Sequence, residues 1–267
     1  MTGKDFDGYV VVVTGGSTGL GRAIAVETAR RGARAVIVNF ASSRDEAAET
    51  VRLVEAEGAQ GILAQGDVAD DAACRAIAAA AEPFGRIDAL FNNAGMTKFA
   101  PNHGDLDALT GDDFLRLYSV NVVGAFQMVR AARPLLEAAP QPGAVVNTSS
   151  IAAVTGIGSS VAYAASKGAM TTMTLSLARG LAPKIRVNAV CPGFIDTPWF
   201  GKSMSEDTVG RMRQGVINST PLKAASTAED IAGAAVFLAA PASRHVTGET
   251  LLVDAGTHLG FASLSMR

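Results

Sequence analysis

The sequence is poor in the residues that build several common kinds of site. It contains two cysteines, Cys74 and Cys191, and three histidines that lie far apart in the chain. This content excludes a disulfide scaffold, suits a reducing cytoplasm and disfavours a conventional zinc site. The net charge of −2 offers no basic surface for nucleic acid, and no apolar run reaches the roughly 18 residues of a membrane helix. Because the N-terminus is polar and unlike a signal peptide, we expect a cytoplasmic protein that binds neither nucleic acid nor membrane.

Apolar residues make up 48% of the 267 residues and charged residues 18%, which is enough to bury a large core. Short runs rich in Val, Ile and Leu alternate with longer stretches rich in Ala, Glu and Arg. The runs lack strict polar alternation, which predicts strands buried on both faces of a parallel sheet. The expected strands are Tyr9–Thr14, Ala35–Phe40, Gly61–Gly66, Ile87–Asn92, Ala144–Thr148, Ile185–Val190 and Thr250–Val253. We therefore expect an α/β fold, a Rossmann-type doubly wound sheet of about seven parallel strands with helices on both faces.

No linker rich in Pro, Gly or Ser divides the chain, so we expect one domain over residues 1–267. Its core would span about residues 8–256, followed by a short tail over 257–267. The segment Thr197–Gln214 resembles an insertion after a strand.

After the first expected strand the chain contains the glycine-rich segment Thr14–Gly21, and a helix is expected to follow. Glycines allow the backbone to turn sharply and to approach a phosphate, and the first turn of a helix offers unpaired N–H groups and a positive dipole end. The spacing is G-x-x-x-G-x-G and not the common G-x-G-x-x-G. The segment predicts a dinucleotide phosphate site, although a tight strand-to-helix connection that binds nothing would also use glycines.

The same segment contains G-x-S-x-G from Gly15 to Gly19, the pattern of a hydrolase nucleophile elbow with Ser17 as the nucleophile. A triad would then need a late histidine, such as His245 or His258. This alternative is disfavoured because the elbow would follow the first strand, with little sheet before it.

The end of the second expected strand bears on cofactor choice, because a carboxylate there binds the ribose hydroxyl of NAD. Here Asn39 stands near the strand end, and no carboxylate follows it until Asp45. Ser42, Ser43 and Arg44 could donate to a 2′-phosphate, so the sequence favours NADP, with NAD as the alternative. Ser43 and Glu46 also match a capping box, in which case Ser43 would only cap the helix and Arg44 would be a solvated charge.

A further group of residues has the chemistry of an acid–base site. Tyr163 and Lys167 are four residues apart in an expected helix and therefore share a face. An ammonium beside a phenol favours the phenolate and lowers the tyrosine pKa from about 10. Ser150 follows a strand and would lie at the same sheet edge as the glycine loop. Taken singly, the pair could be surface residues and Ser150 could be a helix cap.

Together these motifs resemble those of the short-chain dehydrogenase/reductase family, and in particular its 3-oxoacyl-acyl carrier protein reductases. The glycine loop resembles the cofactor fingerprint of that family. The other matching segments are Asn92–Gly95, Asn121–Phe126, Ser150, Tyr163, Lys167, Pro192–Gly193, Asp230–Ala232 and Val246–Asp254. The resemblance covers about residues 8–256. One departure is Thr18, which stands where many NADP-using members carry a basic residue.

The resemblance implies an oxidoreductase that transfers a hydride between NADP(H) and a carbonyl or alcohol substrate. Tyr163 would be the general acid or base, Ser150 would hydrogen-bond the substrate oxygen, and Lys167 would hold the nicotinamide ribose and lower the Tyr163 pKa. Asn121 would position a water of the proton relay, or would only bend its helix. The expected cofactor contacts are Gly15, Ser17, Thr18, Gly19, Leu20, Gly21, Asn39, Ser42, Ser43, Arg44, Asp67, Val68, Asn93, Gly95, Tyr163, Lys167, Pro192, Gly193, Ile195 and Thr197.

The resemblance also implies a homotetramer and a mobile lid over about residues 194–218. The lid contains apolar residues, including Phe194, Trp199, Phe200 and Met204, which would either contact an apolar substrate or only pack on the core. A dinucleotide-binding regulator without turnover is the alternative from another class. The substrate, its stereochemistry and the reaction direction stay open, because a fold does not fix a substrate.

Overall fold

The computed structural model describes residues 4–197 and 205–260. Its strands form one parallel seven-stranded sheet with the order β3-β2-β1-β4-β5-β6-β7. The strands are β1 Val10–Val13, β2 Ala35–Phe40, β3 Gln60–Gln65, β4 Ala89–Asn92, β5 Gly143–Thr148, β6 Ile185–Pro192 and β7 Thr250–Val253. The expected doubly wound α/β fold is confirmed, and all seven expected strands occur in their places.

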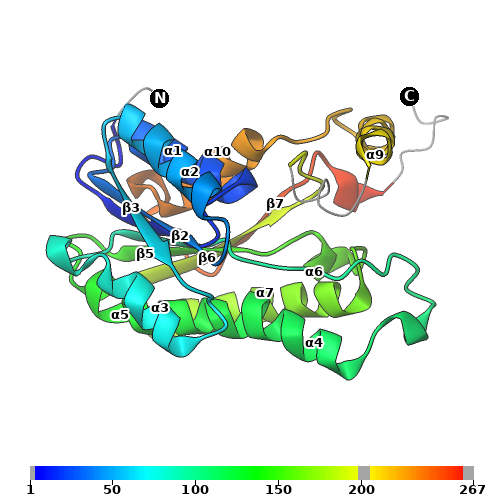
Figure 1. The fold of residues 1–267 in the computed structure, drawn as a ribbon, viewed down its shortest axis with the longest axis horizontal. Coiled ribbons are helices and arrows are strands. Elements are labelled where there is room, and N and C mark those ends of the chain that lie inside the picture. The colour runs from blue at the N-terminus through cyan, green and yellow to red at the C-terminus, as the bar shows by residue number, and fades with distance from the viewer. Residues whose placement is uncertain (1–3, 198–204, 261–267) are drawn as a thin grey trace.

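Helices cover both faces of this sheet (Figure 1). They are α1 Gly19–Arg30, α2 Arg44–Ala56, α3 Asp71–Ala79, α4 Gly111–Tyr118, α5 Ala125–Glu137, α6 Ala152–Thr155, α7 Val161–Leu181, α9 Glu206–Ser219 and α10 Ala228–Ala239. The apolar core has two parts: α1, α2 and α10 pack on one face, and α3, α5 and α7 pack on the other.

The central strand β1 shows why the expected strands lack polar alternation. Val10 and Val12 belong to the core part beneath α3 and α5, whereas Val11 and Val13 belong to the part beneath α1 and α10. All four side chains are fully buried. Since burial of a valine contributes about 1.5–3 kcal/mol, a polar residue at any of these positions would weaken one of the two layers.

The strand order places the site. From β1 the chain winds outward through β2 and β3, then returns to β4 on the other side of β1. The loops that follow β1 and β4 therefore diverge at the carboxyl edge of the sheet and leave a crevice there, as in other doubly wound sheets.

Two local features differ from the sequence-based expectations. Helix α2 begins at Arg44, but the Ser43 side chain makes no capping hydrogen bond, so the expected capping box with Glu46 does not form. Residues Ser119–Gly124 form a π-helical segment between α4 and α5, and this segment contains Asn121.

Part of the expected lid lies outside the described residues, including Trp199, Phe200 and Met204. The same holds for residues 261–267 of the expected tail. The described part of the lid contains α9, a helix of 14 residues. Within residues 4–197 and 205–260, no helix combines the length and the apolar character needed to cross a bilayer.

Candidate active site

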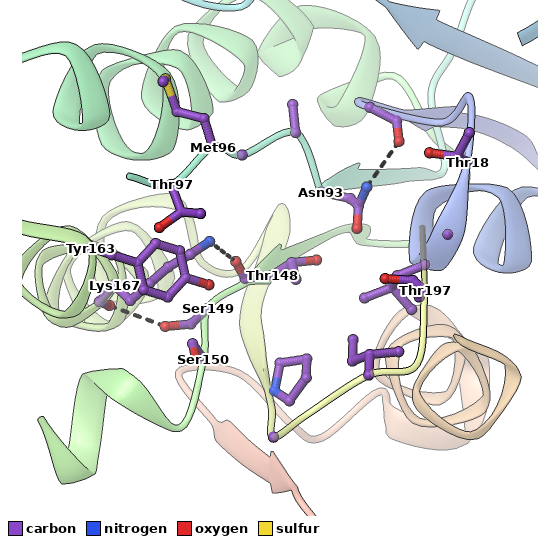
Figure 2. A pocket seen from close by; sticks show the side chains of 18 of the residues that line it. Thr18, Asn93, Met96, Thr97, Thr148, Ser149, Ser150, Tyr163, Lys167 and Thr197 are labelled. Carbon is purple, nitrogen blue, oxygen red and sulfur yellow. Dashed lines mark hydrogen bonds between the residues drawn. The ribbon is translucent and has the colours of Figure 1, made fainter. Parts of the chain in front are cut away.

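A cavity of about 470 Å³ lies at the carboxyl edge of the sheet. Its walls come from the segments after β1, β4, β5 and β6 and from the first turns of α7, and Figure 2 shows them from close by. The lining residues are Gly15, Ser17, Thr18, Gly19, Leu20, Asn93, Ala94, Gly95, Met96, Thr97, Phe99, Thr148, Ser149, Ser150, Tyr163, Lys167, Pro192, Gly193, Ile195 and Thr197. The structure thus brings together most of the residues that the sequence singled out.

The glycine loop can take its shape only because two positions lack a side chain. Gly15 has φ +60°, and a Cβ at Gly21 would lie 2.2 Å from the carbonyl oxygen of Gly15. The loop leads into α1, whose N-cap Thr18 makes no side-chain capping bond and whose first turn carries no acidic residue. The N–H groups of this turn are therefore not engaged by a cap and suit a phosphate group.

Two residues that the sequence did not indicate, Arg22 and Thr50, stabilise the glycine loop through hydrogen bonds. Arg22 donates from Nη2 to the carbonyl oxygen of Ser17 at 2.7 Å, and from Nε to the Thr50 hydroxyl at 2.9 Å. Thr50 donates to the same Ser17 oxygen at 3.0 Å. On the other side, Asn93 donates from Nδ2 to the Gly15 carbonyl oxygen at 3.0 Å. These bonds fix the loop before any ligand binds.

Asn39 has a different role from the one its position suggested. Its side chain is buried, its Oδ1 accepts from the Gly15 N–H at 3.2 Å, and its Nδ2 donates at 3.0 Å to the carbonyl oxygens of both Ala64 and Gly66. The carboxamide therefore ties the glycine loop to the end of β3. The prediction that the Asn39 side chain contacts the cofactor is corrected, because its polar atoms already bond to the protein.

The residues expected at a 2′-phosphate lie at the start of α2. Ser42 and Arg44 are exposed and Ser43 is half-buried, and none of the three lines the described cavity. The hydroxyl of Ser43 is not used as a helix cap, so it stays available to a ligand. Arg22 also reaches this region, since its Nη2 donates to the carbonyl oxygen of Glu46 at 2.9 Å.

Asp67 and Val68, the expected adenine contacts, follow β3 and also lie outside the described cavity lining. Asp67 accepts from the Ala69 N–H at 3.0 Å through Oδ1. The Val68 carbonyl oxygen accepts from Gln127 at 2.9 Å. Both bonds are internal to the protein, so the predicted adenine contacts stay predictions.

Ser150, Tyr163 and Lys167 line the same wall of the cavity (Figure 2). The Ser150 oxygen accepts from the Ala152 N–H at 3.1 Å, which leaves its O–H group able to donate toward the cavity. Tyr163 is held at the first turn of α7, where Ser160 caps the helix by accepting from the Tyr163 N–H at 3.2 Å. Lys167 lies one turn further along the same helix, as the sequence spacing predicted.

The ammonium group of Lys167 points to the strand end and not to the Tyr163 hydroxyl. Its Nζ donates to the carbonyl oxygen of Thr148 at 2.7 Å and lies 5.6 Å from the centroid of the Tyr163 ring. A Cβ at Gly95 would be 3.7 Å from this Nζ. The ammonium therefore lies between the ends of β4 and β5, where it can meet a bound ligand.

Burial shifts the pKa values of both groups. Burial raises the pKa of Tyr163 to about 12, and a hydrogen bond with Ser150 only partly opposes this rise. Burial also lowers the pKa of Lys167 to about 8. The loss of solvation is the main cause of the raised Tyr163 pKa, and the predicted lowering of this pKa by Lys167 stays a prediction.

Asn121 is fully buried in the π-helical segment, and its side chain hydrogen-bonds to two other segments. Its Oδ1 accepts from the Met96 N–H at 2.8 Å, and its Nδ2 donates to the Met96 carbonyl oxygen and to the Ser166 hydroxyl, both at 3.0 Å. Ser166 in turn donates to the Tyr163 carbonyl oxygen at 2.8 Å. The Asn121 side chain thus joins the loop after β4 to the first turn of α7.

The wall after β6 is built on Pro192 and Gly193. The Gly193 N–H donates to the Val253 carbonyl oxygen at 3.1 Å, and a Cβ at Gly193 would lie 2.8 Å from the Asp254 Cβ. The chain then passes through Ile195 to Thr197, whose side chain lies close to Gly19, since a Cβ at Gly19 would be 3.5 Å from the Thr197 Cβ. Ile195 and Thr197 therefore line the cavity, and their predicted contact with the cofactor stays a prediction.

The hydrolase alternative finds no support in this geometry. Ser17 lines the cavity, but no histidine is among the described residues that line it. His258 pairs through Nδ1 with Asp254 at 2.9 Å, in a short turn after β7. This pair is an i, i+4 contact within that turn and does not include Ser17.

The chain was compared with known proteins. Residues 15–258 match the family model described as "Enoyl-(Acyl carrier protein) reductase". One relative is the "Granaticin polyketide synthase putative ketoacyl reductase 2" of Streptomyces violaceoruber, which is 39% identical over 94% of this chain and 96% of its own length. Another is the L-rhamnose 1-dehydrogenase (NAD(P)(+)) of a Sphingomonas strain, at 36% identity over 96% of this chain and 98% of its own length.

Among solved structures, a short-chain dehydrogenase/reductase of glucose/ribitol dehydrogenase type from Brucella melitensis is 31% identical to this chain. It covers 94% of this chain and 97% of its own length, with a TM-score of 0.83. The likeness therefore extends over the whole sheet and the cavity at its edge.

Proposed function

Because the chain belongs to the short-chain dehydrogenase/reductase family, whose members include oxidoreductases acting on carbonyl and alcohol groups, we propose that Tyr163, Ser150 and Lys167 carry out this chemistry with NADP(H). The observation that supports the proposal is that the glycine loop, Ser150, Tyr163 and Lys167 line one cavity.

Tyr163 is the proton donor when a carbonyl is reduced. Since burial raises its pKa to about 12, the phenol keeps its proton at neutral pH, as a donor must. Ser150 donates its O–H to the substrate oxygen and stabilises the negative charge that develops there.

Lys167 and Asn121 support this site. The Lys167 ammonium lies beside Gly95 and Thr148 and holds the ribose hydroxyls of the cofactor. Asn121 holds Met96 and, through Ser166, the first turn of α7. Its side chain therefore acts by positioning, which supports the helix-shaping alternative more than a direct contact with a relay water.

The glycine loop, the uncapped first turn of α1 and the residues after β2 fit a dinucleotide with a 2′-phosphate. NADP(H) supplies the hydride in the reduction and accepts it in the oxidation. Thr18 and the first-turn amides bind the pyrophosphate, and Ser42, Ser43 and Arg44 bind the 2′-phosphate. Arg44 replaces the basic residue that is absent at Thr18.

Fluorescence titration with NADPH and NADH tests this cofactor assignment. We expect NADPH to bind at least about tenfold more tightly than NADH, since a hydrogen bond to a charged group contributes about 1.5–3 kcal/mol. Arg44→Ala should lower the affinity for NADPH and leave that for NADH nearly unchanged. Equal binding of the two cofactors by the wild type would contradict the assignment.

Turnover of the site is tested by the oxidation of NADPH with a panel of ketones. Tyr163→Phe should bind NADPH as the wild type does but lose about 10²–10⁴-fold in kcat, the usual contribution of a general acid. Activity within threefold of the wild type would remove Tyr163 from the mechanism. A protein that binds NADPH but reduces no ketone would instead be a dinucleotide-binding regulator.

We further propose a homotetramer in the cytoplasm. The support is family membership, together with large apolar side chains exposed on α5 and α7, Phe126 and Leu175. Light scattering coupled to size-exclusion chromatography should give four chains per particle, and a monomer would contradict the assembly.

A further inference from the structure

The segment after β6 forms one side of the cavity, and its backbone is fixed up to Asp196. The Gly193 N–H donates to the Val253 carbonyl oxygen at 3.1 Å, and the Asp196 N–H donates to the Ser226 carbonyl oxygen at 2.9 Å. Ile195 also forms an isolated parallel bridge with Ser226. The backbone therefore holds this side of the cavity as an extension of the sheet.

The same segment runs from the catalytic end of the cavity to the glycine loop. At one end the Ile151 N–H, next to Ser150, donates to the Pro192 carbonyl oxygen at 2.9 Å. At the other end a Cβ at Gly19 would lie 3.5 Å from the Thr197 Cβ. A cofactor whose pyrophosphate lies on the glycine loop and whose nicotinamide reaches Ser150 must therefore pass along this segment.

The side chain of Asp196 lies on the outer side of the segment. Ile195 and Thr197 belong to the cavity lining, and Asp196 does not, as expected for neighbours in an extended chain, whose side chains point to opposite sides. The partner of the Asp196 carboxylate is Arg213 of α9, whose Nε lies 2.5 Å from the Asp196 Oδ2. This pair joins α9 to the two lining residues from outside the cavity.

Helix α9 lies at the edge of the molecule, apart from the helices that cover the sheet (Figure 1). None of its residues, Glu206–Ser219, is buried. Its other described side-chain hydrogen bonds stay within the helix and its flanking residues, as the bond from Arg211 to Thr208 does. Among the described residues, the Arg213–Asp196 pair is the one salt bridge between α9 and another part of the chain.

We propose that Arg213 is a positioning residue for the nicotinamide half of the cofactor and that it acts through Asp196 on Ile195 and Thr197. This inference rests on the proposed function, which places the pyrophosphate on the glycine loop and the substrate beside Ser150. Without the pair, the segment after β6 loses its link to α9, and the contacts of the nicotinamide half weaken. The adenosine half, which the glycine loop and the start of α2 bind, keeps its contacts.

Isothermal titration calorimetry of the wild type and Arg213→Gln tests this role with two ligands, NADPH and 2′-phospho-ADP-ribose, which lacks the nicotinamide. We expect the ratio of the dissociation constant of NADPH to that of 2′-phospho-ADP-ribose to rise about two- to fivefold in Arg213→Gln, the range for a partly exposed ion pair. The affinity for 2′-phospho-ADP-ribose should stay that of the wild type.

An unchanged ratio, or an equal loss of affinity for both ligands, would overturn the inference and leave the proposed function intact. An equal loss would show that Arg213 only stabilises the fold. A wild type that binds no NADPH would instead count against the proposed function and against the inference with it.

Arg211→Gln is the matched control, because Arg211 lies on the same helix and its guanidinium donates to the Thr208 hydroxyl of that helix at 3.4 Å. This variant should keep the wild-type ratio, and a rise equal to that of Arg213→Gln would overturn the inference. Asp196→Asn removes the pair from the other side and should raise the ratio as Arg213→Gln does, so it carries the test if Arg213→Gln does not fold. In the double variant the ratio should rise no further than in either single variant, since the two residues act as one pair. Effects that multiply in the double variant would contradict the pair.

Discussion

At the residue scale, proton transfer in the proposed site depends on how burial shifts the pKa values of Tyr163 and Lys167. Both lie in the first turns of α7, but Lys167 donates to Thr148 and not to the phenol. Burial keeps the phenol protonated and makes the ammonium easier to deprotonate than a free lysine. The Tyr163 phenol can therefore donate a proton in the reduction. A ligand that accepts hydrogen bonds from the Lys167 ammonium would stabilise the charged form of this lysine.

Lys167→Met should change the pH dependence of stability. Because the Lys167 pKa falls from 10.5 to about 8 on folding, the unfolded chain binds more protons between these values. The free energy of unfolding of the wild type should therefore rise with pH from about 8 to about 10, relative to Lys167→Met. The full effect is on the order of 3 kcal/mol, since one pKa unit corresponds to about 1.4 kcal/mol.

Urea unfolding of both proteins between pH 7 and 9.5 measures this difference. Lys184→Met is the matched control, because Lys184 is exposed and should show no such trend. A wild type whose stability relative to Lys167→Met stays constant over this range would show that the ammonium is well solvated.

Asn39→Asp tests the hydrogen bonds by which the Asn39 carboxamide ties the glycine loop to the end of β3. The new carboxylate would face the carbonyl oxygens of Ala64 and Gly66, which now accept from the Asn39 amide. We expect the free energy of unfolding to fall by about 1–3 kcal/mol at pH 7, the cost of unpaired buried polar groups, and the loss should shrink at acid pH as the carboxyl gains a proton. Thermal unfolding at pH 7 and pH 5 measures this loss of stability. An unchanged Tm at pH 7 would show that the hydrogen bonds of Asn39 do not stabilise the fold.

At the element scale, the glycine loop and α1 form the phosphate site of the proposed function. The loop is compact because Gly21 packs directly on Gly15 and on Asn93, and Arg22 and Thr50 hydrogen-bond to the Ser17 carbonyl oxygen. In the proposed function, backbone shape provides the pyrophosphate part of this site, and Arg44 supplies at the 2′-phosphate the basic group that is absent at Thr18.

Gly21→Ala should disrupt this site. The added Cβ would lie 2.2 Å from the Gly15 oxygen and 2.6 Å from the Asn93 Nδ2, so the loop must move. Isothermal titration calorimetry should show NADPH affinity lowered more than tenfold. The control is Gly180→Ala in α7, where a Cβ meets no atom within 4 Å and a helical alanine should stabilise the protein by about 0.5–1 kcal/mol. Wild-type affinity in Gly21→Ala would refute the packing argument.

The sequence predicted elements better than it predicted side-chain partners. The strands could be placed because they are short runs rich in apolar residues. Central strands such as β1 are buried on both faces, whereas the edge strands β3 and β7 are only partly buried. The π-helical segment around Asn121 could not, since no pattern in the sequence marks it and its Gly124 packs closely against Val68, which is far away in the chain. The inward bonds of Asn39 and the direction of the Lys167 ammonium depend on tertiary contacts in the same way. The residues that line the cavity were predictable because they follow strands at one edge of the sheet.

At the scale of the whole molecule, the strand order opens a crevice at the carboxyl edge of the sheet. The segments after β1, β4, β5 and β6 line one cavity there, which contains the glycine loop, Ser150 and Tyr163. Asn121 fixes the loop after β4 and contacts α7 through Ser166. The proposed function places the cofactor, the proton donor and the substrate within this cavity.

The transfer of deuterium from NADPH deuterated at nicotinamide C4 tests the central claim most directly. The purified protein is incubated with each of the two C4-deuterated stereoisomers and a ketone, and the alcohol is analysed by mass spectrometry. We predict that one stereoisomer transfers deuterium to the carbinol carbon, and that Tyr163→Phe forms this product at least about 10²-fold more slowly. A protein that binds NADPH but yields no deuterated alcohol with either stereoisomer, or a Tyr163→Phe variant as fast as the wild type, would contradict the account.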